Sequence, residues 1–137
     1  MTGVDPSQVM LRLGRWLAVL GRSRNVVFVE GTAESLPLPD ESATVVWALR
    51  SFHHWTDHAA GISEAHRVLA PGGRVIIAER LIKPGARGRG AHGLSSLQAD
   101  RLAYGLRATG FSDVRQLPKG AGRQSMFITL GLGCIRD

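Results

Sequence analysis

The first third of the chain alternates between short strand-like runs and one longer amphipathic stretch. Residues 2–4 and residues 25–29 have the composition of short strands. Between them, Asp5-Pro6 opens a helix, because Asp is a favourable N-cap and Pro is pre-set for the first helical position. Gly21 ends that helix. Apolar residues recur within it at helical spacing and predict one apolar face: Val9, Leu13, Trp16, Leu17 and Leu20.

The middle of the chain predicts two more strands on either side of a helix. Residues 44–49 form a continuous apolar run, which is the pattern of a strand buried on both faces. A helix is expected over about residues 57–69, with Ile62, Ala65 and Leu69 facing inward. A tight turn at residues 70–73 leads into a strand at residues 74–79.

The last third begins with a basic, glycine-rich loop and ends with a helix and two strands. Ser95 and Gln98 have the spacing of a capping box. The helix that follows carries Leu102 and Leu106 inward and stops at Gly110. Residues 114–117 and 125–130 are expected to form an antiparallel pair around a turn at residues 120–122. This succession of strands and helices predicts an α/β layered fold with a mainly parallel sheet.

Composition places the protein among globular chains. It has 137 residues, of which 44% are hydrophobic, and no apolar run approaches the roughly 18–20 residues that span a bilayer. We find no signal peptide at the start, and the single cysteine, Cys134, cannot form an intrachain disulfide. These features suit a cytoplasmic protein. The net charge of +6 is spread along the chain, which argues against a dedicated nucleic-acid face. The basic stretch at residues 83–90 is either a solvated loop or a contact for an anionic ligand.

Three stretches resemble one enzyme family. Residues 30–40, residues 52–57 (Phe-His-His-Trp-Thr-Asp) and residues 67–74 occur in an order and spacing similar to those of the ubiquinone/menaquinone-biosynthesis type (methyltransferase type 11) of class I S-adenosylmethionine (SAM)-dependent methyltransferases. Residues 108–111 before a late strand agree with it. The resemblance implies a Rossmann-like fold and SAM as the cofactor. It also implies that residues 1–137 form one methyltransferase-like domain that is N-terminally truncated, without the family's first strand, Gly-rich turn and first helix.

The resemblance also suggests where the cofactor would bind. Asp5 matches the acidic residue that hydrogen-bonds the ribose hydroxyls, although its other interpretation is a simple helix cap. Thr32, Ala33 and Glu34 match the adenine loop, whose other interpretation is an ordinary polar loop. The family usually has Asp where Thr32 stands, and Thr lacks the charge that strengthens a hydrogen bond. Since the Gly-rich turn is also missing, we expect SAM binding to be weak or absent.

Candidate chemistry follows the strand at residues 44–49. Arg50 and Ser51 match the stretch that borders the SAM sulfonium and the substrate, near the switch point of an α/β sheet. His53 and His54 are the candidate bases, because methyl transfer needs a base only where the acceptor must lose a proton. Their other interpretation is structural packing or capping of the next helix. No histidine spacing predicts a metal site, so none is expected.

Three functions are compatible with these patterns. The first is a SAM-dependent methyltransferase acting on a small molecule. The second is a catalytically inactive, methyltransferase-like module that oligomerises or binds a partner. The third, a nucleic-acid-binding domain, has only the charge in its favour.

An assembly prediction follows from the implied truncation. Without a neighbour, residues 44–49 would form a free apolar edge, which is a template for pairing with another strand. Either the strand at residues 25–29 shifts across to it within one chain, or two chains pair as a two-fold dimer. We favour the homodimer.

Overall fold

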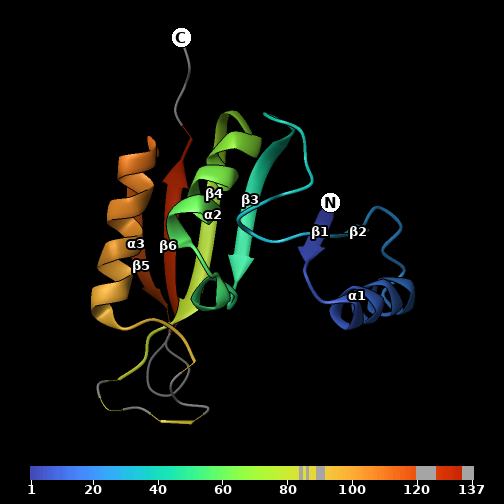
Figure 1. The fold of residues 1–137 in the computed structure, drawn as a ribbon, viewed down its shortest axis with the longest axis horizontal. Helices are drawn as coiled ribbons and strands as arrows, with labels where there is room; N and C mark the ends of the chain where they lie inside the picture. Colours follow the sequence, from blue (N-terminus) through green and yellow to red (C-terminus); the bar gives the residue numbers. More distant parts are fainter. Residues whose placement is uncertain (84, 86, 89–91, 120–125, 134–137) are drawn as a thin grey trace.

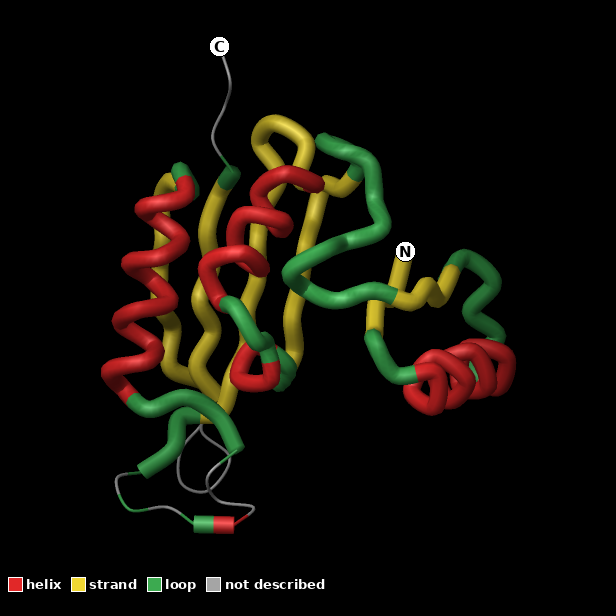
Figure 2. The backbone as a smooth tube through the Cα atoms, in the orientation of Figure 1, coloured by secondary structure: helices red, strands yellow, loops and turns green. Residues whose placement is uncertain are grey.

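The computed structural model describes residues 1–83, 85, 87–88, 92–119 and 126–133 and shows a mixed α/β fold (Figures 1 and 2). Its elements, in chain order, are β1 (Thr2–Asp5), α1 (Gln8–Leu20), β2 (Val27–Glu30), β3 (Ala43–Leu49), the 3-10 turn η1 (Phe52–His54), α2 (His58–Val68), β4 (Leu69–Arg80), α3 (Ser96–Thr109), β5 (Ser112–Lys119) and β6 (Met126–Leu132). The predicted alternation of strands and helices is therefore confirmed. No helix in the described ranges is long and apolar enough to cross a membrane.

The N-terminal elements form a small unit of two parallel strands and one helix. β1 and β2 pair in register from Thr2↔Val27 to Asp5↔Glu30, and α1 packs against both. The helix cap is Ser7, whose side chain accepts from the Met10 N–H, and not Asp5 as expected. Asp5 instead accepts a 2.7 Å bond from the Ser7 N–H through Oδ1. This places the Asp5 carboxylate at the C-terminal end of β1.

The remaining strands form a four-stranded sheet in the order β3-β4-β6-β5. β3 and β4 are parallel, whereas β6 runs antiparallel to both β4 and β5. The predicted antiparallel pair at the C-terminal end is thus confirmed, while its turn at residues 120–122 lies outside the described residues. Among the strands that the structure describes, the parallel pairs are β1-β2 and β3-β4. The predicted turn at residues 70–73 lies within β4, which twists through Gly72 at φ 73° before it pairs regularly with β3.

The core lies between the sheet and the two helices α2 and α3, which cover the same face (Figure 1). Both helices begin and end as their sequences predict: α3 has the complete capping box of Ser95 and Gln98, and Gly110 ends it at φ 105°. The five residues predicted to face inward are all buried: Ile62, Ala65, Leu69, Leu102 and Leu106.

β3 corrects one expectation, because only one of its faces is buried. Val46 and Ala48 point toward the core, whereas Val45, Trp47 and Leu49 are 43%, 57% and 53% exposed. The physical reason is that α2 and α3 cover a single face of the sheet. In the described part of the chain β3 also pairs on one edge only, with β4. β2 pairs with β1, so the predicted alternative in which it shifts across to β3 is not the structure adopted.

Candidate functional site

The segment after β3 turns sharply and divides its side chains between the core and the surface. Arg50 adopts a positive φ of 52°, and its N–H donates to the Ala78 carbonyl of β4 at 2.8 Å. Ser51 precedes η1 and accepts the His54 N–H through its carbonyl. Phe52 enters the core, His53 is half-buried and His54 is exposed at the surface of the turn. The two candidate bases are therefore held by a backbone that is itself anchored to β4.

His53 is tied to Glu79, a residue that the sequence analysis did not single out. Glu79 lies on β4, is only 1% exposed, and its two carboxylate oxygens lie 3.1 and 3.0 Å from Nδ1 of His53. The His53 backbone N–H also donates to Glu79 Oε1 at 3.3 Å. An ionised carboxylate only accepts hydrogen bonds, so Nδ1 carries the proton and Nε2 of a neutral His53 keeps its lone pair. The available signal was a carboxylate that directly follows the apolar run at residues 75–78.

His54 and His92 lie beside this pair. The ring of His53 is 4.0 Å from that of His54 and 5.9 Å from that of His92, measured between centroids. One ring nitrogen from each of the three histidines lies within 4.8 Å of the other two. His54 does not cap α2, because Asp57 does so. The expectation of no metal site rested on spacing along the chain, and it could not anticipate that His92 folds back to His53.

The aromatic residues that flank the histidines have structural roles. Trp55 packs against the core, and its ring lies 4.8 Å from that of Phe52. Gly61 of α2 makes room for it, since a Cβ there would lie 2.5 Å from the indole. His58 stacks on Phe52, and its Nε2 lies 3.0 Å from the Phe52 carbonyl oxygen. These contacts hold η1 against the start of α2 and the core.

The ribose and adenine candidates lie on the N-terminal unit and on the loop that follows β2, whereas Arg50 and Ser51 follow β3. An open depression next to Asp5 is lined by the ends of β1 and β2 and by that loop: Pro6, Glu30, Gly31, Thr32, Ser35 and Pro37. Gly31 cannot carry a side chain here, because a Cβ would lie 2.6 Å from the Pro37 ring. The Asp5 carboxylate uses one oxygen for Ser7 and retains the capacity to accept further hydrogen bonds.

Glu34 connects this loop to the histidine segment. Its Oε1 accepts the backbone N–H groups of Thr56 at 2.7 Å and Asp57 at 3.2 Å. The pKa of Glu34 lies below its ordinary value, chiefly because its own backbone N–H stabilises the carboxylate, with further help from Asp57, Thr56 and the Thr32 hydroxyl. Thr32 and Glu34 are thus engaged with each other and with the start of α2. Their proposed contact with adenine stays a prediction.

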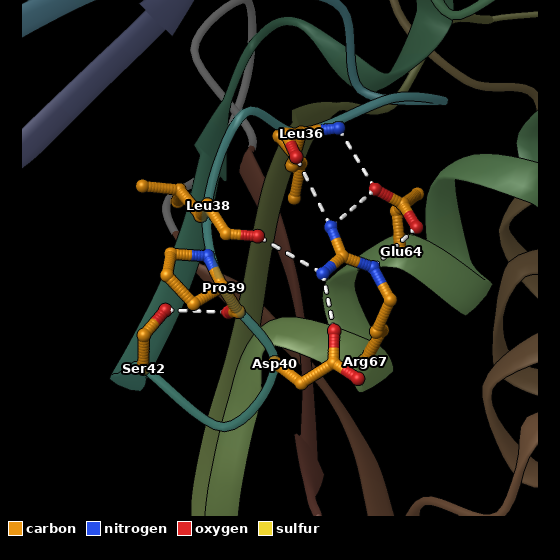
Figure 3. A network of polar contacts seen from close by, with 7 residues as sticks. All are labelled: Leu36, Leu38, Pro39, Asp40, Ser42, Glu64 and Arg67. Carbon is orange, nitrogen blue, oxygen red and sulfur yellow. Dashed lines mark hydrogen bonds and ion pairs between the residues drawn. The ribbon is translucent and has the colours of Figure 1, made fainter.

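Arg67 of α2 holds the same loop at its far end (Figure 3). Its guanidinium donates to the carbonyls of Leu36 and Leu38 and to the carboxylates of Asp40 and Glu64. Glu64 in turn accepts the Leu36 N–H at 2.8 Å. The pKa of Glu64 is lowered, first by its hydrogen bond from Arg67, and that of Arg67 is raised, first by its bond to Glu64. The sequence analysis missed this network, because its members lie up to 31 residues apart.

Comparison with known proteins decides the family. A family model described as a methyltransferase domain matches residues 1–77, more than half of the chain. The chain belongs to this methyltransferase-domain family. The matched residues of this methyltransferase domain include every predicted site residue, from Asp5 to His54, whereas Glu79 and His92 lie beyond them.

Individual relatives agree with that assignment. The 27-O-demethylrifamycin SV methyltransferase of Amycolatopsis mediterranei is 48% identical over 63 residues, which cover 46% of this chain and 23% of that protein. The demethylmenaquinone methyltransferase of Chlorobaculum tepidum is 40% identical over 82 residues, which cover 60% of this chain and 32% of that protein. The matched stretch thus spans a third or less of these relatives.

A solved structure agrees at the level of the fold. A SAM-dependent methyltransferase from Aquifex aeolicus superposes with a TM-score of 0.74 at 14% identity, and the match covers 96% of this chain and 67% of that chain. Likeness at this identity concerns the fold, and it confirms the predicted Rossmann-like architecture.

Proposed function

We propose that this methyltransferase domain transfers a methyl group from SAM to a small-molecule acceptor, with His53 as the base. The observation that carries the proposal is the pairing of His53, in the turn after β3, with the buried carboxylate of Glu79 on β4. Glu34 links this pair's segment to the loop predicted to contact the cofactor. Family membership supports the same reaction class.

For this reaction the protein has to position SAM and the acceptor and to remove a proton from the acceptor's nucleophile. SAM supplies a methyl group on a sulfonium, whose leaving thioether needs no protonation. The acceptor's nucleophile must lose its proton, and Nε2 of His53 can take it while Glu79 stabilises the imidazolium that results. His54 is adjacent and exposed, so it is the second candidate for this role. Arg50 and Ser51 are proposed to line the cofactor and acceptor side of the same turn.

The residues present fit part of the cofactor. The Asp5 carboxylate at the edge of the open depression can accept bonds from two ribose hydroxyls. Thr32, which lines this depression, and its neighbours Ala33 and Glu34 are proposed to contact the adenine. We expect affinity weaker than a dissociation constant of about 1 µM, equivalent to roughly −8 kcal/mol.

Calorimetry with SAM tests this proposal first. Asp5→Ala should weaken binding, whereas the control Asp100→Ala, an exposed acidic position on α3, should leave it unchanged. An unchanged affinity in Asp5→Ala would remove Asp5 from the site. A dissociation constant at or below about 1 µM, or roughly −8 kcal/mol, would contradict the expectation that binding is weak or absent.

Turnover tests the catalytic role. Transfer from radiolabelled SAM should be assayed first with the acceptors for which the two relatives are named, a demethylrifamycin and a demethylmenaquinone. His53→Ala should lower kcat by ~10²–10⁴-fold and change SAM affinity less, because general-base help has that magnitude. A variant with undiminished kcat would return His53 to a purely structural role.

We also propose that two copies associate, and that they do so in the cytoplasm. The support is the free edge of β3, whose exposed residues Val45, Trp47 and Leu49 form an apolar strip. A two-fold axis would bring two such edges together as an antiparallel pair. The apolar residues that α1 exposes, such as Trp16 and Leu20, add to the surface that a partner could cover.

A further inference from the structure

We propose that His53, His54 and His92 form a binding site for a divalent transition-metal ion, with Zn²⁺ as the expected occupant. This inference goes beyond the proposed methyl transfer and does not rest on it: an ion on Nε2 of His53 occupies the lone pair that the proposed base would use, so the metal-bound chain is a separate state in which His53 is not the base. It rests on three observations: the convergence of three imidazoles, the buried carboxylate behind one of them, and the anchoring of His92.

The three imidazoles are close enough to share one ion. One ring nitrogen of each lies within 4.8 Å of the other two. In a tetrahedral zinc site with Zn–N bonds of about 2.0–2.1 Å, ligand nitrogens lie about 3.3 Å apart. The His54 and His92 rings are exposed, so rotation of these side chains can bring the ligand nitrogens from their present separations, which are within 4.8 Å, to the separation that a tetrahedral site needs. Imidazole suits Zn²⁺, Ni²⁺, Co²⁺ and Cu²⁺, and does not favour Mg²⁺ or Ca²⁺.

Glu79 gives His53 the arrangement of a metal-binding histidine. Metal-ligating histidines commonly donate their other ring N–H to a carboxylate, which fixes the tautomer and makes the ligating nitrogen more basic. His53 does so through Nδ1, with both oxygens of Glu79 at 3.0–3.1 Å, which leaves Nε2 as the ligating atom. A buried carboxylate is costly unless it is paired. A cation on Nε2 would strengthen the pairing by polarising the Nδ1–H bond.

His92 is held near the other two by a buried anchor two residues later. Leu94 is fully buried; its N–H donates to the Arg80 carbonyl at 2.9 Å, and its own carbonyl accepts the Ile82 N–H at 2.9 Å. Gly93 passes so close to β4 that a Cβ would lie 2.2 Å from the Arg80 carbonyl oxygen. Leu94 therefore joins the end of β4, which carries Glu79, and brings His92 to the same place.

Three protein ligands leave one tetrahedral position open. In zinc enzymes with three protein ligands that position holds water or substrate. Here the ion would lie at the C-terminal end of the parallel strands β3 and β4, where open α/β sheets bind their ligands. A hydroxyl or carbonyl oxygen of a small molecule could therefore complete the coordination.

Metal binding can be measured on the full chain after removal of any affinity tag. Zn²⁺ titration by calorimetry and metal analysis after dialysis should give one ion per chain. Co²⁺ should give the visible absorption of a tetrahedral site. His92→Ala, an exposed substitution, should weaken Zn²⁺ binding at least about 10-fold, and Glu79→Gln should weaken it 10–100-fold, as is typical of such outer partners.

The matched control is His66→Gln on α2, whose ring contacts Phe111 outside the cluster. It should leave Zn²⁺ affinity unchanged, and circular dichroism should show that each variant is folded. The proposal is overturned if the chain binds no ion at about 1 mM Zn²⁺, or if His92→Ala binds as tightly as the unmodified chain. Equal losses in His92→Ala and His66→Gln would also overturn it.

Discussion

At the scale of single residues, the carboxylates of Glu34, Glu64 and Glu79 each accept backbone N–H groups. Glu79 accepts both the ring and the backbone N–H of His53. Glu34 accepts two backbone N–H groups at the start of α2, and Glu64 accepts one from Leu36. In Glu34 and Glu64 these bonds favour the charged form, and the pKa of each carboxyl is lowered. The bonds also fix the loops on which the candidate site depends.

The lowered pKa of Glu64 predicts how stability changes with pH. A carboxyl with a folded pKa below its ordinary 4.5 contributes stability that is fully present above that value. The contribution is lost as the pH falls through the folded pKa. Glu64→Gln should therefore lower the thermal midpoint at pH 7, and the difference from the unmodified chain should shrink toward pH 3. A difference that stays constant over that range would show that the charge of Glu64 is not involved.

At the scale of elements, the loop between β2 and β3 is tied to α2 at both of its ends. Glu34 binds the start of the helix, and Arg67 near its end binds the carbonyls of Leu36 and Leu38. The position of the loop proposed to contact adenine is thus set by α2, which packs on the four-stranded sheet.

Arg67→Lys tests this tie. A lysine cannot reproduce the forked contacts with two carbonyls and two carboxylates, so the loop should open more often. Amide exchange of Leu36 should become faster, because its N–H would lose a partner that Arg67 positions. Arg115→Lys is the matched control, since Arg115 pairs only locally with Asp113 on β5. Equal exchange rates at Leu36 in all three proteins would contradict the role of Arg67.

At the scale of the whole molecule, helices α2 and α3 of the described residues cover one face of the four-stranded sheet (Figure 1). On β3, Val45, Trp47 and Leu49 are exposed. Exposed apolar surface next to a free strand edge favours association.

Light scattering after size exclusion should therefore show a dimer at micromolar concentration. Val45→Lys places a charge on the free edge strand and should shift the population to monomers. Leu97→Lys, a matched change on exposed α3, should not. A monomeric unmodified chain whose Val45 and Trp47 amides resist exchange would contradict pairing through β3.

The sequence by itself determined the order of the main elements and the ends of α3, whereas it misplaced the cap of α1 and the start of β4. Capping by Ser95 and Gln98, termination at Gly110 and the inward positions of α2 and α3 depend on neighbours within four residues. The resemblance to the methyltransferase family likewise came from short local motifs. His53 and His54 were found in this way, because they are adjacent in the chain.

Only the tertiary structure decided which residues meet and which surfaces are covered. Glu79 reaches His53 because β3 and β4 pair in parallel, and His92 arrives through the contact of Leu94 with the end of β4. The apolar pattern of β3 predicted burial on both faces, but a pattern records which side chains could be buried and not whether another element covers them. Whether a face of a strand is covered depends on packing between elements that are distant in sequence. Local hydrogen bonding and periodicity do not encode that packing.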